Sequence, residues 1–378
     1  MIKCRMHTGV GTLELMTEAS FRSEWLSLFA QCPWATPFQR FEYADAWYTA
    51  YLTVQEPVVV TARNPDDRLV GLFAGGRSAQ GIVAVGAHQS EYPGWLAAPD
   101  VHVAVFDAML EELDANFGRT ALMFRYLPAA FPVADLCRNS RHRSRILTRP
   151  YLRPLMDLAT ASAGDSLKKK GNRNRLNRLK RHGSVQLEVV DDVEGLERVF
   201  DVLIAQYDSR QLAINDVSPF ASDVNKRTFH IEMMRRGLLH VCVLRVGDNV
   251  AAAVLAMRSP AEVSLAIVSF DVEFADESPN KLLLLLLAQR LAGDGFHLLD
   301  LTPGGDPWKD LFANRYEEVR ELRILRTPGA RLLKSADQMA RRFVKEVDRR
   351  YFRGAVGRIH KRAKGWTGIR IPAFLARR

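Results

Sequence analysis

Hydrophobic and polar positions between residues 263 and 326 follow an order that predicts strand, turn, long helix, strand, short helix and strand. The first strand is VSLAIVSFDV. The six leucines at 282–287 predict a helix that is buried on most sides, and Gly293 and Gly295 end it before the strand HLLDL. The short helix and the last strand lie within TPGGDPWKDLFANRYEEVRELRIL. This stretch therefore predicts a buried helix between two neighbouring strands.

The start of that helix is the first candidate binding site. Ser278 is expected to cap free N–H groups, and Pro279 in the first turn loses no hydrogen bond that the helix could have made. A strand that leads into a helix N-terminus places free N–H groups and a partial positive charge beside the sheet. Ser278, Asn280 and Lys281 are therefore predicted to contact a pyrophosphate or another anion.

The rest of the chain shows the same kinds of element in two halves. In the first half, SFRSEWLSLFAQ and FEYADAWYTAYL predict helices, and PVVVTAR, RLVGLFAGGR and GIVAVG predict a meander of antiparallel strands, followed by a helix over 102–117 and the strand TALMFRYL. In the second half, two helices and the hairpin LLHVCVLRVGDNVAAAVLAMRS precede the leucine-rich stretch. We predict four segments: a first α/β domain at 1–158, a basic linking helix at 159–183, a second α/β domain at 184–328 and a basic helical tail at 329–378.

These elements and several phrases resemble a known superfamily. The order of helix pair, three strands, helix, strand, short helix and strand is similar to that of a GNAT-type acyltransferase, in which acyl-CoA lies between the splayed strands on either side of the central helix. DESPNKLLLLLLAQRLAGDGFHLLDLTPGGDPWKDLFANR, with WLSLFA and TPFQRFEY, resembles more narrowly the CelD-like acetyltransferase family of cellulose and exopolysaccharide synthesis. That family is related to the Fem aminoacyltransferases, which carry two GNAT-like domains. The resemblance implies an α/β (α+β) chain of two tandem GNAT-like domains, each a mixed, mostly antiparallel sheet flanked by helices, with acyl-CoA as donor.

Three residues are candidates for the chemistry of acyl transfer, which needs a base for the acceptor and a donor for the developing oxyanion. Asp300 ends the strand HLLDL, where the reacting groups would meet, and Asp271 ends the strand before the anion-binding turn. Lys309, in GGDPWKDLF, corresponds to the lysine of the F/Y-K-x-x-F phrase of Fem-like proteins, and the resemblance implies that it supports the oxyanion. A capping carboxylate, a turn residue and a surface lysine are the structural alternatives for these three positions.

Positive charge is concentrated in two segments of a chain whose net charge is +10. The segment from Arg326 to Arg378 carries 16 Lys/Arg against three Asp/Glu, and the segment from Arg138 to Arg181 carries 14 against two. SLKKKGNRNRLNRLKRHG predicts one helix, capped by Asp165 and Ser166, with a thin leucine stripe. Its arginines are either a solvated face or further contacts to a phosphorylated donor, and the ones singled out for contact are Arg173, Arg175 and Arg178.

Several classes of function and location are disfavoured by the remaining features. The four cysteines have no CxxC spacing, no metal-ligand cluster is recognisable, and no apolar run is long enough to span a bilayer or form a signal peptide. We therefore expect a cytoplasmic protein that uses no metal. The basic amphipathic tail is expected to cap the protein's own acidic body, with an anionic inner-membrane surface, a polysaccharide synthase or nucleic acid as alternative partners.

The prediction that follows is an acyltransferase that moves an acyl group from acyl-CoA to an amine or hydroxyl of an amino sugar or similar acceptor in polysaccharide or envelope synthesis. Two alternatives remain open. One is a Fem-like aminoacyltransferase, whose donor tRNA would suit the basic segments. The other is a non-catalytic scaffold of a polysaccharide synthase, because the turn EFADESPNK lacks the glycines usual in the GNAT pyrophosphate loop.

Overall fold

The computed structural model describes residues 2–160 and 163–328. Contacts between residues divide the chain into one compact unit, Met1–Ile324, and a second, Leu325–Arg378. The first unit has an N-terminal half, residues 2–160, and a C-terminal half, residues 163–324. The predicted tail helix at 329–378 lies outside the described residues.

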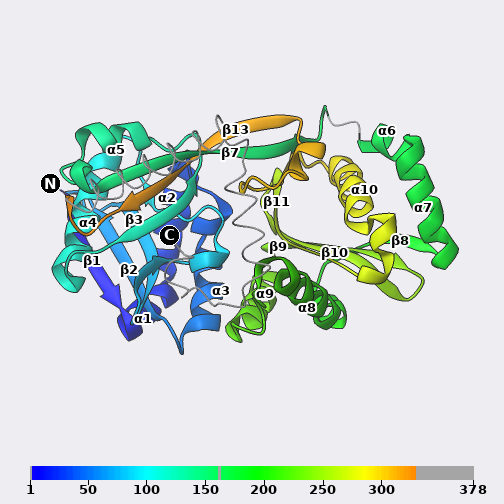
Figure 1. The fold of residues 1–378 in the computed structure, drawn as a ribbon. Helices are drawn as coiled ribbons and strands as arrows, with labels where there is room; N and C mark the ends of the chain where they lie inside the picture. Colours follow the sequence, from blue (N-terminus) through cyan, green and yellow to red (C-terminus); the bar gives the residue numbers. More distant parts are fainter. Residues whose placement is uncertain (1, 161–162, 329–378) are drawn as a thin grey trace, which may run out of the picture. The chain divides into compact units, whose positions relative to one another are not determined.

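The N-terminal half is built around a five-stranded antiparallel sheet in the order β1-β2-β3-β4, with β5 paired to β3 (Figure 1). Its elements are β1 (Lys3–Thr8), α1 (Gly9–Thr17), α2 (Ala19–Gln31), η1 (Pro37–Gln39), α3 (Phe41–Tyr51), β2 (Glu56–Arg63), β3 (Leu69–Ser78), β4 (Gly81–Ala84), η2 (Ala87–Gln89), β5 (Leu96–Ala97), α4 (His102–Phe117), β6 (Leu122–Leu127), α5 (Val133–Asn139), η3 (Arg143–Arg145) and β7 (Ile146–Asp157).

The C-terminal half supplies most of an eight-stranded sheet in the order β6-β13-β7-β12-β11-β10-β9-β8. The pair β11 and β12 is parallel and the other pairs are antiparallel. Its elements are α6 (Ala163–Lys168), α7 (Lys170–His182), β8 (Val185–Val190), α8 (Val193–Asn215), α9 (Asn225–Arg235), β9 (Leu239–Val246), β10 (Asn249–Arg258), β11 (Glu262–Phe270), η4 (Val272–Glu277), α10 (Pro279–Gly293), β12 (Leu298–Asp300), η5 (Lys309–Leu311) and β13 (Arg315–Ile324).

The large sheet crosses from one half to the other. Its strands β6 and β7 come from residues before 158, and β7 lies between β12 and β13. The ladder of β7 with β13 runs from the pair Ile146 and Ile324 to the pair Leu155 and Arg315, and the two strands lie side by side along their length in Figure 1. The predicted limit at residue 158 therefore falls at the end of a strand that belongs to both halves, and the domain limits themselves stay a prediction.

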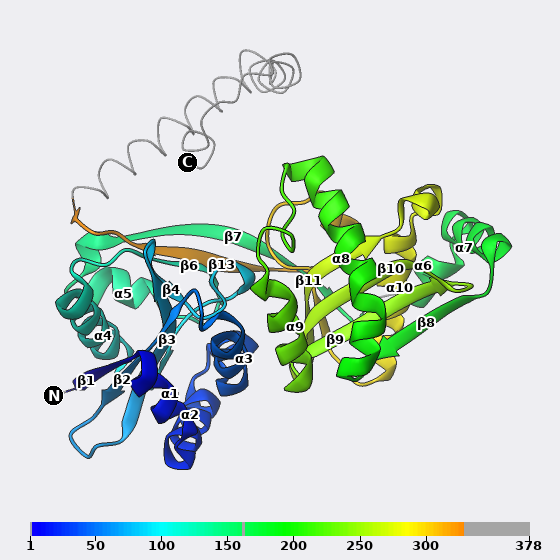
Figure 2. The same ribbon diagram turned by 90° about the horizontal axis from the view of Figure 1, so that it is seen from below.

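Helix α10 fills the core on one face of β9, β10 and β11, while α8 and α9 cover the other face (Figures 1 and 2). Five of the six leucines at its start are buried, as the pattern predicted: Leu282, Leu283, Leu284, Leu285 and Leu287. Proline in the first turn and the end at Gly293 are also confirmed. The fold class predicted from the sequence, α/β with mixed sheets flanked by helices, is therefore confirmed.

Some local predictions are corrected by the structure. Ser278 precedes α10, but its side chain makes no capping hydrogen bond, because its backbone is left-handed with φ +53°. The linking segment forms two helices instead of one, since α6 ends at Lys168 and α7 begins at Lys170. Asp165 and Ser166 lie inside α6 and not before its first residue. Strands β1, β5 and β8 and helices α1 and α5 were not predicted.

The two halves pack where α3 meets α9 and the residues that flank α9, and the ring of Phe229 contacts those of Tyr43 and Tyr51. The phenol of Tyr51 donates to Asp223 at 2.6 Å, and Arg236 pairs with Asp45 at 2.7 Å. Among the helices of the described residues, none is long and apolar enough to cross a membrane.

Candidate active site

Strands β11 and β12 separate after a short parallel ladder. The ladder has only three pairs, which are Glu262 with Leu298, Val263 with Leu299 and Ser264 with Asp300. Strand β11 continues beyond them to Phe270. A register shift against β10 makes Ala266 the extra residue of a bulge, and this residue is exposed in the middle of a central strand. Bulges re-aim side chains and end strand pairing, often beside active sites. The result is an open wedge whose apex lies between Ser264 and Asp300.

A cleft of about 370 Å³ occupies the open end of this wedge. Its walls come from the end of β11, the start of α10 and the segment around η5. All three residues predicted to contact the donor at the helix start lie in its wall. The lining residues are Arg210, Val268, Phe270, Ala275, Ser278, Pro279, Asn280, Lys281, Leu284, Trp308, Leu311 and Phe312.

The cleft is apolar along its sides and cationic at two places. Lys281 lies in the first turn of the 15-residue helix α10, whose N-terminal end adds partial positive charge. Arg210 reaches the cleft from α8, and its Nη1 donates to the carbonyl of Val268 at 3.2 Å. The Oδ1 atom of Asn280 is buried with no hydrogen-bond partner within the part of the chain that the structure describes. This arrangement suits a long molecule with an apolar body and an anionic end.

The three arginines predicted on the linking helix do not line this cleft. Arg178 contacts the turn that precedes the cleft: its Nη2 donates to the carbonyl of Asp276 at 2.8 Å, and its Nε lies 3.4 Å from Glu277. Arg173 is exposed and Arg175 is half-buried. Sequence reasoning predicted a basic helix whose arginines contact the donor, but side-chain direction, which sets what each arginine reaches, is not visible in a charge count.

Asp300, predicted as a catalytic carboxylate, lies fully buried at the apex of the wedge. Its Oδ2 accepts from the Tyr92 phenol at 2.5 Å and from Arg153 at 3.0 Å, and its Oδ1 accepts from the Thr302 amide at 2.8 Å. Burial, and then the charge of Asp300, raise the pKa of Tyr92 well above its ordinary value, so the phenol stays a donor. Asp300 therefore joins its own strand, β12, to β7, which carries Arg153, and to the loop that carries Tyr92.

The same arginine joins further carboxylates to this network. Arg153 forms ion pairs with Glu262 and, at 3.3 Å, with Glu317, and its guanidinium lies 5.0 Å from the centre of the Tyr92 ring. Burial raises the pKa of Glu262, and the charge of Arg153 opposes that shift. The apex of the wedge is thus closed by buried charges from both halves.

Lys309 turns back toward the end of β12, and its side chain is only 8% exposed. Its Nζ donates to the carbonyls of Thr302 at 2.9 Å and Pro303 at 3.2 Å, and lies 3.0 Å from Asp306. These three acceptors match the three protons of an ammonium group. Thr302 has φ +62°, a conformation that costs free energy for a residue with a β-branched side chain. In this structure Lys309 fixes the loop between β12 and η5.

Asp271, the third predicted catalytic residue, caps η4 by accepting from the amide of Glu273 at 2.9 Å.

Sequence reasoning did not single out Glu91, a half-buried residue between η2 and β5 of the N-terminal half. Burial, followed by the charge of Asp300, raises the pKa of Glu91 to about 7. No local pattern marks this glutamate, because its environment is made by residues more than 30 positions away in sequence.

A second cavity, of about 510 Å³, reaches the apex from the N-terminal half. It combines Glu262, Ser264 and Arg153 of the large sheet with Tyr92 and with aromatic and proline residues of the first half. Its lining is Leu26, Phe29, Pro33, Trp34, Ala35, Thr36, Pro37, Arg40, Tyr92, Pro128, Arg153, Ser259, Pro260, Glu262 and Ser264.

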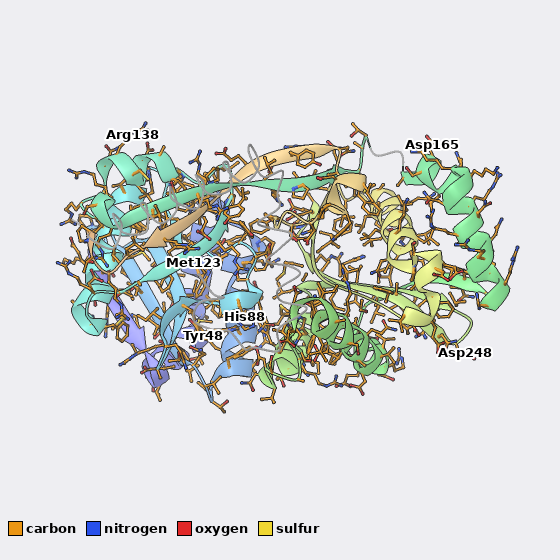
Figure 3. The ribbon with its side chains drawn as sticks, in the orientation of Figure 1. Tyr48, His88, Met123, Arg138, Asp165 and Asp248 are labelled. Atoms are coloured by element: carbon orange, nitrogen blue, oxygen red, sulfur yellow. The ribbon has the colours of Figure 1, made fainter. Side chains whose placement is uncertain are left out.

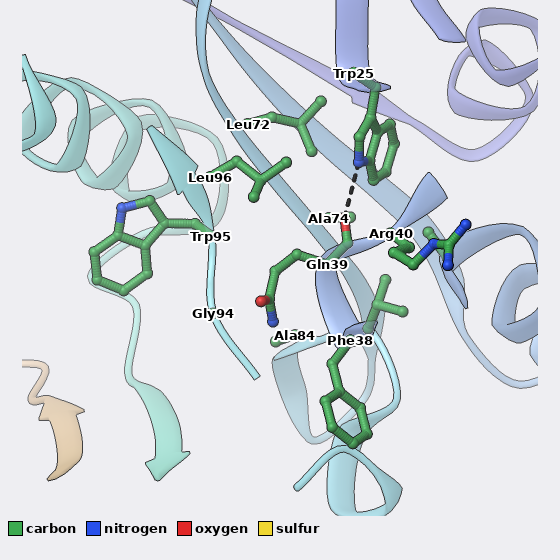
Figure 4. Close-up of a pocket in the computed structure, with 12 residues that line it drawn as sticks. Trp25, Phe38, Gln39, Arg40, Leu72, Ala74, Ala84, Gly94, Trp95 and Leu96 are labelled. Carbon is green, nitrogen blue, oxygen red and sulfur yellow. Dashed lines mark hydrogen bonds between the residues drawn. The ribbon is translucent and has the colours of Figure 1, made fainter. Parts of the chain in front are cut away.

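A third hollow, inside the N-terminal half, is too small to hold a substrate. It measures about 10 Å³, and Figure 4 shows the side chains that line it. The indole of Trp25 donates to the carbonyl of Gln39 at 2.9 Å in its wall. About one water fits such a space. This hollow therefore belongs to the core.

Residues 166–310 match the family model described as acetyltransferase (GNAT) domain. No curated protein matches the chain. The C-terminal domain (DUF2156) of a putative lysylphosphatidylglycerol synthetase from Agrobacterium fabrum is 13% identical with a TM-score of 0.52, over 84% of this chain and 95% of that one. FemX is 10% identical with a TM-score of 0.54, over 82% and 98%. L-PGS from Bacillus licheniformis is 11% identical with a TM-score of 0.51, over 81% and 92%.

At these identities the likeness shows a shared fold, and the family match covers the segment that forms the wedge. The protein therefore has the fold of GNAT-type acyltransferases. The narrower resemblance to the CelD-like family stays a prediction. Within residues 2–160 and 163–328, no cluster of three or more histidine, cysteine or carboxylate side chains is arranged to hold a metal ion.

Proposed function

We propose that the protein is an acyltransferase that binds acyl-CoA in the cleft between β11, α10 and η5 and transfers the acyl group to an amine or hydroxyl. The observation that carries this proposal is the position of the cleft: it fills the wedge of two parallel strands and ends at Lys281 in the first turn of α10. An elongated donor with an anionic end fits that shape and charge.

The donor would lie along the free side of β11. The donor's phosphates would contact Lys281, Asn280 and the N-terminus of α10. The apolar side chains of Val268, Phe270 and Leu284 would pack against the extended arm of the donor. An extended, amide-containing arm can bond to the backbone of a strand that has lost its neighbour. The thioester would then reach the bulge at Ala266, close to the apex.

The acceptor would approach through the second cavity. Aromatic and proline side chains such as Phe29 and Trp34 line it, and Arg153 and Glu262 provide polar groups near the apex. Apolar faces with a few fixed polar groups are common in sites for small organic molecules. A saccharide with an amino group, used in polysaccharide or envelope synthesis, is the acceptor that we propose.

One observation favours a second donor class. The exposed face of α7 carries Arg173, Lys180 and Arg181, and Arg178 touches the turn beside the cleft. A tRNA-borne aminoacyl donor, as in Fem-like transferases, would use such a face. The affinity of the protein for a tRNA donor should then fall steeply with added salt, because contacts between basic side chains and phosphates release counterions. Donor binding that does not depend on salt would remove the tRNA alternative. A wild-type protein that binds no acyl-CoA would favour the non-catalytic scaffold.

The donor site is tested by isothermal titration calorimetry with acetyl-CoA and free CoA. Ala275 is exposed in the wall of the cleft, so Ala275→Trp should fill it and weaken binding at least tenfold. Ala292→Trp, at an exposed position near the other end of α10, is the matched control and should bind as the wild type does. Equal affinity in the two variants would remove this cleft as the donor site.

A further inference from the structure

The second cavity, of about 510 Å³, has one wall from each half of the protein. The N-terminal half supplies Arg40, which precedes α3, together with aromatic and proline side chains such as Trp34. The large sheet supplies Glu262 and Ser264 of β11 and Arg153 of β7. Pockets for small organic molecules measure about 300–1,000 Å³ and fix their ligands through a few polar groups. The polar groups of the two walls therefore indicate which acceptor fits.

The wall from the large sheet carries an excess of negative charge. Arg153 forms ion pairs with the carboxylates of Asp300, Glu262 and Glu317. Glu317 also pairs with Arg315, at 2.6 Å. Three carboxylates thus share two guanidiniums, and one negative charge of this cluster is left without a counter-charge.

Glu262 is the carboxylate of this cluster that lines the cavity. Its Oε1 accepts from Arg153 and, at 3.1 Å, from the Ser264 hydroxyl, whereas its Oε2 makes no hydrogen bond within residues 2–160 and 163–328. The Nε atom of Arg153 is buried and has no hydrogen-bond partner in the same part of the chain. Buried polar groups without a partner are rare in native proteins. Both atoms are therefore available to an acceptor.

The wall from the N-terminal half carries the opposite excess. Glu42 lies 3.3 Å from the Nε of Arg40 and 3.4 Å from Arg22, so two guanidiniums share one carboxylate. Arg40 is the member of this group that lines the cavity, and its side chain is 35% exposed. Only its Nε hydrogen-bonds to the protein among the described residues, which leaves both Nη groups free. One positive charge is thus offered to a ligand.

We propose that the acceptor is an amphoteric amine, whose amino group binds Glu262 and whose carboxylate or phosphate binds Arg40. Complementary charges of a site and its ligand determine specificity, so Arg40 would select the acceptor. This proposal rests on the proposed acyltransferase function. It narrows the acceptor to an amine with an anionic group, such as an acidic or phosphorylated amino sugar or an amino acid.

The amino group is assigned to the sheet wall because that wall adjoins the proposed donor site. Ser264 forms the last pair of the parallel ladder with Asp300, and the bulge at Ala266 lies two residues, or about 7 Å, further along β11. An amine that donates to Oε2 of Glu262 is then held near the place proposed for the thioester. The two free Nη groups of Arg40 suit a carboxylate or a phosphate, each of which can accept two parallel hydrogen bonds.

The first test measures CoA release from acetyl-CoA with pairs of amines that differ by one anionic group. The pairs are propylamine with β-alanine, ethanolamine with phosphoethanolamine, and glucosamine with glucosamine 6-phosphate. For the wild-type protein, kcat/KM should be at least roughly tenfold higher for the anionic member, as a charge-assisted hydrogen bond provides. The first pair against the other two distinguishes a carboxylate from a phosphate. Equal kcat/KM within every pair would overturn the proposal.

Arg40→Gln should remove this preference by raising KM for the anionic member roughly tenfold, while kcat and the neutral member stay unchanged. Arg138→Gln is the matched control. Arg138 also pairs with a carboxylate, that of Asp135 at 2.8 Å, but it is exposed on α5 at the edge of the N-terminal half (Figure 3). A preference that survives Arg40→Gln, or an equal fall for both members of a pair, would overturn the role of Arg40.

Glu262→Gln tests the other end of the acceptor. This change keeps the size of the side chain and removes its charge, so KM should rise roughly tenfold for both members of a pair, because each of them carries the amine. Arg40→Gln, in contrast, affects only the anionic member. Unchanged KM for both members in Glu262→Gln would overturn the placement of the amino group.

Acceptor binding without a donor separates failure of this proposal from failure of the proposed function. Saturation-transfer-difference NMR with the same amine pairs, in the absence of acetyl-CoA, reports acceptor binding alone. Binding of the anionic member that Arg40→Gln removes would support the site, even for a protein that binds no acetyl-CoA and is therefore no acyltransferase. A protein that binds acetyl-CoA and releases CoA without preferring the anionic member would overturn the amphoteric acceptor alone.

Discussion

At the scale of single residues, the end of β12 combines buried charge with a strained loop. The guanidinium of Arg153 forms ion pairs with three carboxylates, those of Asp300, Glu262 and Glu317. The Tyr92 phenol joins the network by donating to Asp300. Buried charges cost free energy unless they are paired and hydrogen-bonded. Each partner of this network is therefore expected to matter for stability, whatever its role in catalysis.

The Tyr92 phenol provides the first test. Tyr92→Phe removes the only hydroxyl that donates to Asp300 among the described residues, and a hydrogen bond to a buried charge contributes about 1.5–3 kcal/mol. Urea denaturation should show a loss of that size. Tyr316→Phe is the matched control, since its hydroxyl also donates to a carboxylate, Asp310, but at an exposed site. The control should change the free energy of unfolding by less than about 0.5 kcal/mol.

Lys309→Met tests the second buried cation. The change removes donors from the carbonyls of Thr302 and Pro303, so we expect about 1–3 kcal/mol lower stability from unsatisfied buried groups. If Lys309 also supports the oxyanion, kcat with acetyl-CoA should fall at least tenfold below that of the wild type at a temperature where both proteins stay folded. Lower stability with an unchanged kcat would leave Lys309 as a loop anchor only.

The position of a residue could be predicted where local order in the chain sets it, and not where distant segments meet. Asp300 was singled out because it ends a strand and Lys309 because it corresponds to the lysine of a Fem-like phrase; their catalytic roles stay predictions, and both residues lie around the end of β12. Glu91 was not singled out, since Asp300 and Lys309 lie more than 200 positions away. The cap expected at Ser278 is absent for a local reason, because Ser278 also ends the η4 turn, where its backbone is left-handed with φ +53°.

At the scale of elements, α10 is the best predicted part of the chain. Its leucines, proline and terminal glycine all act locally and agree with one another. The basic linking segment was less predictable: α6 and α7 separate at Lys169, although the charge pattern continues without a break. A thin leucine stripe leaves the direction of a helix to tertiary contacts, such as the packing of Leu179 in the core around α10.

The start of α10 provides the element-level prediction. Lys281→Glu places a negative charge where the donor's phosphates are proposed to bind. Acetyl-CoA should therefore bind at least roughly tenfold more weakly in calorimetry. The melting temperature should hardly change, because the side chain is only half-buried. Lys3→Glu, on β1, is the matched charge reversal and should bind donor normally. Equal affinity in both variants would remove Lys281 from the donor site.

At the scale of the whole molecule, the two halves share one sheet. Strand β7 lies between β12 and β13, and β6 extends the same sheet beyond β13. The repeated order of elements predicted two domains from the sequence. It could not predict this exchange of strands, because pairing partners depend on where the second half docks.

This topology predicts that the halves do not fold separately. A fragment of residues 184–328 lacks β6 and β7, so its β12 and β13 lose the strand that pairs with both. We expect it to show little cooperative structure by circular dichroism, whereas residues 1–328 should unfold in one calorimetric transition with equal calorimetric and van't Hoff enthalpies. A cooperatively folded 184–328 fragment would show that the C-terminal half is an independent domain.

The proposed function depends on acyl-CoA lying in the wedge between β11 and β12. A crystal structure of the protein with acetyl-CoA measures this directly. We expect the phosphates at Lys281 and Asn280, the arm along Val268 and Phe270, and the thioester near Ala266. Acetyl-CoA bound at another place, or an empty cleft at saturating acetyl-CoA, would contradict the proposed donor site.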